Sequence, residues 1–157
     1  MYENVLALHN LLRWAVVLAL GWAALRATSG WLAARPWRPA DRAAGRWLAI
    51  ALDVQLVVGL VLYGALSPLT RKAMGDMGAA MADPGTRFFA VDHAVGGILA
   101  VAIVHGAQVM ARKVGRDVGK HRLLAIVYGV VIALLVFSVP WPWMGQARPW
   151  FRMPLAG

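Results

Sequence analysis

The chain contains no cysteine and only seven acidic residues among its 157. Without cysteine it cannot form disulfides, thiolate metal sites, iron–sulfur clusters or the covalent haem link of a Cys-x-x-Cys-His motif. It also lacks a Gly-rich phosphate loop, a His-Glu-x-x-His zinc motif and a nucleophile elbow. Nucleotide-dependent and hydrolytic functions therefore have no recognisable residues in this sequence.

Charged residues make up only 15% of the chain, whereas 61% of it is hydrophobic. Soluble globular domains are roughly 45–50% apolar, so the composition indicates a protein in contact with the lipid bilayer. The net charge of +9 does not indicate nucleic-acid binding, because the basic residues occur in short blocks between apolar runs. With about 150 residues per domain as a guide, residues 1–157 are expected to form a single domain.

Four apolar runs have the length, about 20 residues, that a helix needs to cross the hydrocarbon core. They lie near Val5–Leu25, Trp47–Leu66, Phe88–Met110 and Leu123–Val139. Runs of this length without period-two alternation favour helices over a barrel. The sequence therefore predicts an all-α integral membrane four-helix bundle with up-down-up-down topology. The first run has no basic segment before it, so we expect a retained helix and not a cleaved signal peptide.

Basic residues are concentrated in the first and third connections between these runs. The cations there are Arg26, Arg35, Arg38, Arg42, Arg46, Arg112, Lys113, Arg116, Lys120 and Arg122. The second connection and the tail after the last run hold fewer cations, and Asp76 and Asp83 lie in the second connection. The positive-inside rule therefore predicts that the first and third connections are cytoplasmic and that both termini are extracytoplasmic.

Aromatic side chains gather directly after the last apolar run. They are Trp141, Trp143, Trp150 and Phe151. An amphipathic ring is favoured at headgroup depth, so this group is typical of an interfacial aromatic belt. The same Trp-rich end is also a possible docking surface for a partner protein.

Two histidines lie at the same expected depth in different helices. His9 stands about one turn inside the first predicted helix and His93 about one turn inside the third, and both helices enter from the outer side. Two such imidazoles can be the axial ligands of a non-covalent b-type haem. Gly96 and Gly97 follow on the same helical face as His93 and could leave room for the macrocycle. The glycines could equally let two helices approach closely.

Charged groups accompany both histidines, although an ionisable residue within a membrane helix is costly. Arg13 lies one turn from His9 and Asp92 adjoins His93, so the two could form a charge pair between the first and third helices. Arg13 or Arg87 could alternatively bind a haem propionate. In the competing interpretation, the polar residues at this level form only a structural clamp between helices.

Three further ionisable groups are expected farther from the outer face than His9 and His93. His105 is about 18 Å along the helix from His93, and Asp53 reaches a similar depth on the second helix. The two could form a hydrogen-bonded pair, contribute to a proton path or flank a second cofactor site. One histidine with one carboxylate is a poor haem ligand set, so a single haem is preferred. His121 is expected at the cytoplasmic interface, and Gln55, Tyr63, Asn10 and Gln108 are expected only as interhelical hydrogen-bonding groups.

Several short motifs, taken in order, resemble a family of small bacterial four-helix membrane proteins called cytochrome b or cytochrome b561-like. They are Leu8-His9-Asn10-Leu11-Leu12-Arg13-Trp14, Asp53-x-Gln55-x-x-x-Gly59-Leu60-x-Leu62-Tyr63, Arg87-Phe88-x-x-Val91-Asp92-His93 and Pro140-Trp141-Pro142. The resemblance spans nearly the whole chain. It implies a location in the bacterial cytoplasmic membrane, non-covalent haem b and electron transfer, with His9 and His93 at the family's histidine positions. This chain departs at Asp53, where the family is expected to carry a histidine.

Three functions are therefore compared. The preferred one is an electron carrier with one haem b between the first and third helices near the outer face, exchanging electrons with the quinone pool or a respiratory-complex partner. The second is a cofactor-free structural or assembly subunit of a membrane complex. The third is a small proton-linked transporter that uses Asp53 and His105, although no broken helix or internal repeat supports it. None of the three assigns the chain an enzymatic reaction of its own.

Overall fold

The computed structural model describes residues 1–152, and within them the regular structure is entirely helical. Four helical rods are long and apolar enough to cross a membrane. They are α1 (Tyr2–Leu32), α2 (Pro39–Val61) with its π-helical extension η1 (Leu62–Leu66), α5 (Pro84–Arg87) with η2 (Phe88–Asp92) and α6 (His93–Lys113), and α7 (Asp117–Ser138). Two short helices, α3 (Pro68–Gly75) and α4 (Met77–Ala82), connect the second and third rods. The prediction of an all-α chain with four helices able to cross a membrane is confirmed.

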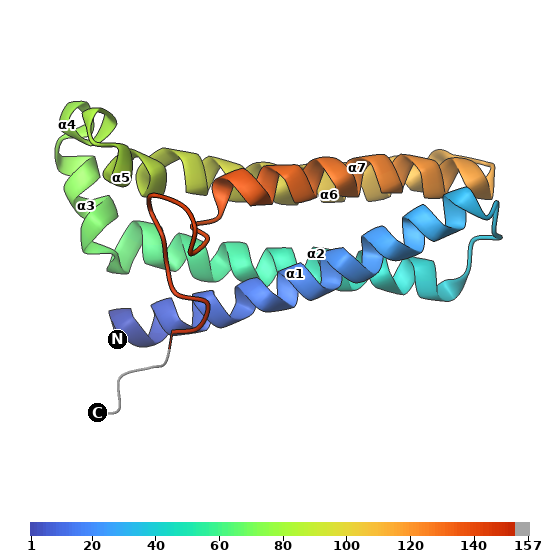
Figure 1. Cartoon of the computed structure of the whole chain (residues 1–157), viewed down its shortest axis with the longest axis horizontal. Coiled ribbons are helices and arrows are strands. Elements are labelled where there is room, and N and C mark those ends of the chain that lie inside the picture. The colour runs from blue at the N-terminus through green and yellow to red at the C-terminus, as the bar shows by residue number, and fades with distance from the viewer. Residues whose placement is uncertain (153–157) are drawn as a thin grey trace.

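The long helices are arranged so that α1 and α6 lie at opposite corners of the bundle. Both α1 and α6 pack against α2 and α7. The connections α1–α2 and α6–α7 are short and lie at one end of the bundle, whereas α3, α4 and the N-terminus lie at the other (Figure 1). Residues 139–152, after α7, return across the bundle toward the first turns of α1 (Figure 1). A ligand between α1 and α6 would therefore lie across the diagonal of the bundle.

Small side chains let the four helices approach closely along the middle of the bundle. Ala23, Ala27, Ala44, Ala100 and Ala107 are buried there together with Leu48, Val104, Tyr128 and Val131. Many of the largest apolar side chains instead point outward, among them Leu18, Leu25, Val57 and Phe137. This division is expected in lipid, where helices associate through close packing and large apolar residues remain favourable on the outer surface. The outer surface is thus compatible with contact to a bilayer.

A buried carboxylate joins the parts of the bundle at the end with the short connections. Asp41 accepts a hydrogen bond from Arg26 Nε at 2.7 Å and another from the backbone N–H of Arg38 at 2.8 Å. Arg35 Nη2 approaches the same carboxylate at 3.4 Å. Asp117 accepts a hydrogen bond from the backbone N–H of Trp37 at 3.0 Å, which ties this connection to α7. The bond from the Arg38 N–H satisfies the backbone donor directly before the first residue of α2.

His121 is buried inside the bundle near the start of α7, and its expected depth at the cytoplasmic interface stays a prediction. The residue has no exposed surface. Its ring lies against Gly30 of α1 and 4.9 Å from the ring of Trp37, measured between centroids. The absence of a side chain at Gly30 leaves the space that the imidazole fills. The place of His121 in the sequence indicates its depth along α7. It does not indicate which face of α7 carries the side chain.

We predict that Gly30→Ala destabilises the bundle, because a Cβ at this position would overlap the His121 ring. Overpacking of this kind costs about 1–3 kcal/mol. The measurement is the thermal unfolding midpoint in mild detergent, followed by circular dichroism. The matched control is Gly21→Ala in the same helix, where a Cβ meets nothing within 4 Å. Equal midpoints for the two variants would contradict the proposed packing.

Candidate functional site

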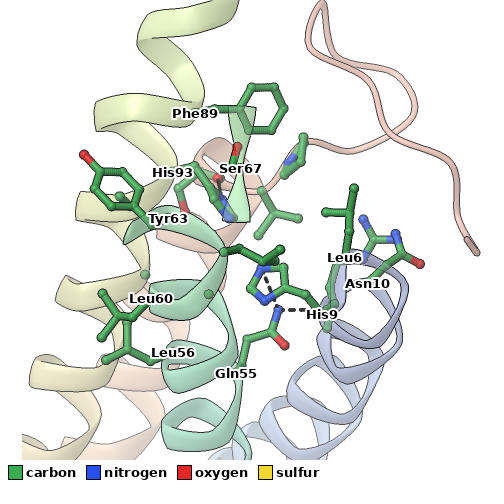
Figure 2. A pocket seen from close by; sticks show the side chains of 18 of the residues that line it. Leu6, His9, Asn10, Gln55, Leu56, Leu60, Tyr63, Ser67, Phe89 and His93 are labelled. Carbon is green, nitrogen blue, oxygen red and sulfur yellow. Dashed lines mark hydrogen bonds between the residues drawn. The ribbon is translucent and has the colours of Figure 1, made fainter. Parts of the chain in front are cut away.

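A cavity of about 680 Å³ opens between the four long helices at the end of the bundle that carries α3 and α4. Its walls are mainly apolar, with residues such as Leu6, Leu56, Leu60, Val95 and Ile98. Polar side chains line it too, among them Glu3, Arg13 and Arg148. His9, Gln55 and His93 are the polar groups that Figure 2 shows meeting in it. Volume and lining are in the range of small-molecule and cofactor sites, which are apolar with a few placed polar groups.

His9 reaches the cavity from α1 and is held by α2. The amide nitrogen of Gln55 donates to the backbone carbonyl of His9 at 3.1 Å and lies 3.3 Å from its ring nitrogen Nε2 (Figure 2). Gly59, one turn along α2, leaves the space beside the ring, since a Cβ there would lie 3.0 Å from His9 Cε1. The other ring nitrogen, Nδ1, is buried and has no hydrogen-bond partner within residues 1–152. A buried nitrogen without a partner is costly, and this one lies beside the cavity.

His93 reaches the cavity from the first turn of α6 and is held by the end of α7. Its Nδ1 lies 2.7 Å from the carbonyl oxygen of Ser138. A carbonyl can only accept, so Nδ1 carries the proton and Nε2 keeps its lone pair. Phe88 stacks on the ring at a centroid distance of 6.1 Å. Metal-binding histidines usually donate the second ring N–H to a carbonyl or carboxylate in this way.

The structure brings the two histidines together across the bundle diagonal. Their ring centroids are 6.0 Å apart, and the ring planes are nearly perpendicular at 87°. Each ring has one nitrogen next to a protein group, Gln55 for His9 and Ser138 for His93. The sequence placed the histidines at one depth, and the interhelical hydrogen bond expected of Gln55 is confirmed. The sequence did not identify His9 as the partner of Gln55 and assigned no role to Ser138. Both holding contacts join different helices, so no spacing within one helix could have predicted them.

Arg13 does not pair with Asp92, and this prediction is wrong. The guanidinium is only 7% exposed and donates from Nη2 to the carbonyl oxygens of Pro149 at 3.2 Å and Trp150 at 2.8 Å. Asp92 instead faces Arg87, with 3.7 Å between Nε and the carboxylate and both side chains about half exposed. The returning C-terminal segment supplies backbone acceptors directly beside Arg13, so the arginine needs no carboxylate.

We call residues Val139–Arg152 the C-terminal strap, because this segment crosses the first turns of α1. Asn10 and Trp14 donate to the same two carbonyls that accept from Arg13. Arg152 closes the contact with an ion pair to Glu3 at 2.6 Å. Trp141 of the strap is buried, whereas Trp143, Trp150 and Phe151 remain largely exposed. The aromatic belt stays a prediction for those three exposed rings.

The two glycines expected beside a cofactor have different surroundings. A Cβ on Gly96 would overlap the side chain of Ser138, so this glycine permits close contact between α6 and α7. Gly97 lines the cavity, and a Cβ there would meet nothing within 4 Å. The alternative use of the first glycine in helix packing is therefore the correct one. Only Gly97 leaves open space on the cavity side.

The predicted hydrogen bond between Asp53 and His105 is confirmed, with 2.9 Å between Oδ1 and Nε2. The pair does not line the cavity. It joins α2 to α6 on the outer surface, and the two side chains are 47% and 49% exposed. Tyr63 and Gln108 also make the expected interhelical bonds, to the carbonyl oxygens of Ala90 and Gly45, both at 2.8 Å.

We predict that Arg13→Leu releases the C-terminal strap from α1, because two carbonyls lose their charged donor. Chymotrypsin cleavage after Trp143 and Trp150 in detergent should then become several-fold faster, as mass spectrometry of the fragments over time would reveal. Arg87→Gln is the control, since Arg87 makes no bond to the strap within residues 1–152. Unchanged cleavage of the Arg13 variant would show that the other contacts hold the strap without it.

Compared with known protein families, curated proteins and solved structures, the chain matches none of them. The function therefore has to be inferred from the cavity and the two histidines that meet in it.

Proposed function

We propose that the chain is a membrane electron carrier that holds one b-type haem between α1 and α6, with His9 and His93 as the axial ligands. The distance between the two rings is the observation that carries this proposal. Each metal–imidazole bond is about 2.0 Å long, and each ring centre lies about 1 Å behind its nitrogen, so an iron between two imidazoles separates the ring centres by roughly 6 Å. The observed separation is 6.0 Å.

The hydrogen bonding of the rings also supports a metal between them. His93 Nδ1 is engaged by the Ser138 carbonyl, and no hydrogen bond reaches its Nε2 within the described residues. His9 Nδ1 is buried without a partner. A metal would bind the free Nε2 lone pair of His93, while Ser138 would keep that ring oriented and more basic. At His9 the Gln55 N–H donates to Nε2, so Nδ1 would bind a metal once the Gln55 amide turns its oxygen toward Nε2.

The ligand set fits a haem better than a bare ion. Within residues 1–152, no group of three or more histidine, cysteine, aspartate or glutamate side chains could hold a metal ion. Two imidazoles are enough for haem iron, because the porphyrin supplies the other four nitrogen ligands. The mainly apolar cavity around the pair supplies the low-polarity surroundings that a macrocycle needs.

The C-terminal strap, and not Arg13 or Arg87, is expected to supply the cation that binds a haem propionate. The Arg13 guanidinium already bonds two carbonyls, and Arg87 does not line the cavity. Arg148 and Arg152 do line it, and the guanidinium of Arg148 lies 4.4 Å from the centroid of the Phe89 ring. We therefore assign Arg148 as the cation for a haem propionate, where a charge-assisted hydrogen bond is favoured.

The bound haem would supply one-electron transfer, and the protein would supply orientation and exclusion of water. The basic connections α1–α2 and α6–α7 lie at one end of the bundle, and α3 and α4 lie at the other (Figure 1). The cavity is at the end with α3 and α4. By the positive-inside rule, the end with the basic connections faces the cytoplasm, both termini are outside and the haem lies near the outer face. The quinone pool or a respiratory complex of the bacterial cytoplasmic membrane is the electron partner in this proposal.

We predict that the protein, purified in mild detergent from cells supplied with a haem precursor, gives the sharp reduced α and Soret bands of a b-type cytochrome. His9→Ala and His93→Ala should each lose most of the bound haem, measured per protein by visible difference spectra. His105→Ala is the matched control on α6, because His105 lies outside the cavity. A colourless but folded wild-type protein would overturn the haem proposal and favour the structural-subunit function.

A second prediction concerns orientation. The chain has no cysteine, so a single introduced thiol reports one site. Met81→Cys in α4 should react with a membrane-impermeant maleimide on intact spheroplasts, and Gly115→Cys between α6 and α7 only after lysis. Both positions are exposed. The reverse pattern would place the cavity on the cytoplasmic side.

A further inference from the structure

The Asp53–His105 pair is the one ionisable group pair within the described rods that lies far from both ends and half-exposed on the outer surface. Asp53 lies near the midpoint of the 28-residue rod Pro39–Leu66, and His105 is eight residues before the end of α6. Their side chains are 47% and 49% exposed. Arg13 and Asp41 are covered, and the other half-exposed pair, Arg87–Asp92, includes the fourth residue of its rod, so that pair reaches the rod's end.

Lipid is a poor neighbour for this pair. Hydrocarbon offers neither donors nor acceptors, and intramembrane ionisable residues almost always face protein or a water-filled cavity. The bond between Asp53 Oδ1 and His105 Nε2 uses one atom of each side chain. The remaining acceptor, Oδ2, and the remaining ring nitrogen, Nδ1, have no hydrogen bond within residues 1–152. The face therefore needs a cover that brings both a donor and an acceptor.

The surface around the pair allows another helix to approach. Ala102 and Gly106 lie one turn apart on α6, and both are exposed. A Cβ on Gly106 would meet nothing within 4 Å. Val57 of α2 and Val109 of α6 extend the same outer face with exposed apolar side chains. Small residues beside a polar group are the usual composition of a helix–helix contact in membranes.

We propose that a second copy of this chain covers the α2–α6 face, with the two Asp53–His105 pairs facing each other across a two-fold axis. A two-fold contact requires a patch that complements itself. This patch does so when His105 is protonated on both ring nitrogens, because each copy then offers one carboxylate acceptor and one imidazolium donor that its own Asp53–His105 bond does not use. In this contact each His105 is an imidazolium, whose Nε2 donates to Asp53 Oδ1 of its own copy and whose Nδ1 donates to Oδ2 of Asp53 in the second copy.

The dimer does not depend on haem. The pair lies outside the cavity that holds His9 and His93, so a colourless protein would still present the same face. The two proposals therefore fail separately, the first in visible spectra and the second in measurements of association.

Cross-linking tests the dimer directly. Ala102→Cys places the only thiol of the chain on the proposed contact, and Val130→Cys places it on the lipid-facing side of α7, where Val130 is exposed. Purified protein in liposomes with a large excess of lipid is oxidised with copper phenanthroline and run on a non-reducing gel. We expect at least tenfold more dimer from Ala102→Cys. Equal yields, or cross-links only to other proteins in native membranes, would overturn the proposal.

The polar pair itself is tested by combining Asp53→Leu and His105→Leu with the Ala102→Cys thiol. We expect the dimer yield to fall at least tenfold while the helical circular dichroism is retained. Ala102→Phe, which keeps the pair and adds bulk at the contact, should give the monomer mass in size-exclusion light scattering where the unsubstituted chain gives the dimer. A dimer that persists in both variants would contradict the proposed contact.

Discussion

The hydrocarbon core of a membrane offers no hydrogen-bond partners, so the polar side chains of these four helices depend on other parts of the chain. Arg13 is met by backbone carbonyls of the C-terminal strap, and Asp41 is met by arginines and a backbone N–H. Tyr63 and Gln108 reach carbonyl oxygens on neighbouring helices. The helices thus pack where these bonds form, and the small residues between them allow the necessary approach.

Two places in the bundle contain polar atoms that lack a hydrogen-bond partner from the described residues. His9 has a buried nitrogen without a partner, and it lies beside the other histidine at the edge of a mainly apolar cavity. A haem iron bound between the two histidines would give this nitrogen a partner inside the cavity. Asp53 and His105 satisfy each other only in part and face outward, so a second protein copy would satisfy them from outside. The two sites thus lead to different proposals, a cofactor in one and a partner in the other.

Much of the fold could be predicted from the sequence, because helix number depends on the length of apolar runs. The runs predicted the rods, although the helices extend further at the basic end, where α1 reaches Leu32 and α2 begins at Pro39. The shared depth of His9 and His93 also followed from counting residues. Counting residues gives the depth of a side chain along its helix. It does not give the face of the helix that carries the side chain or the neighbour that it contacts. For that reason Gln55 was expected only as an interhelical hydrogen-bonding group and not as the one that holds His9. Ser138 was missed, and the partner of Arg13 was predicted wrongly.

The geometry of the histidine pair permits a test that depends on the central claim alone. The ring planes stand at 87°, and a ferric haem with two perpendicular imidazole ligands gives a strongly anisotropic low-spin signal in electron paramagnetic resonance. We predict this signal from the oxidised protein at cryogenic temperature. A rhombic low-spin signal would indicate parallel ligand planes, and a high-spin signal would indicate that one ligand is missing. Either result, or no haem signal at all, would contradict a haem held by His9 and His93 in the observed arrangement.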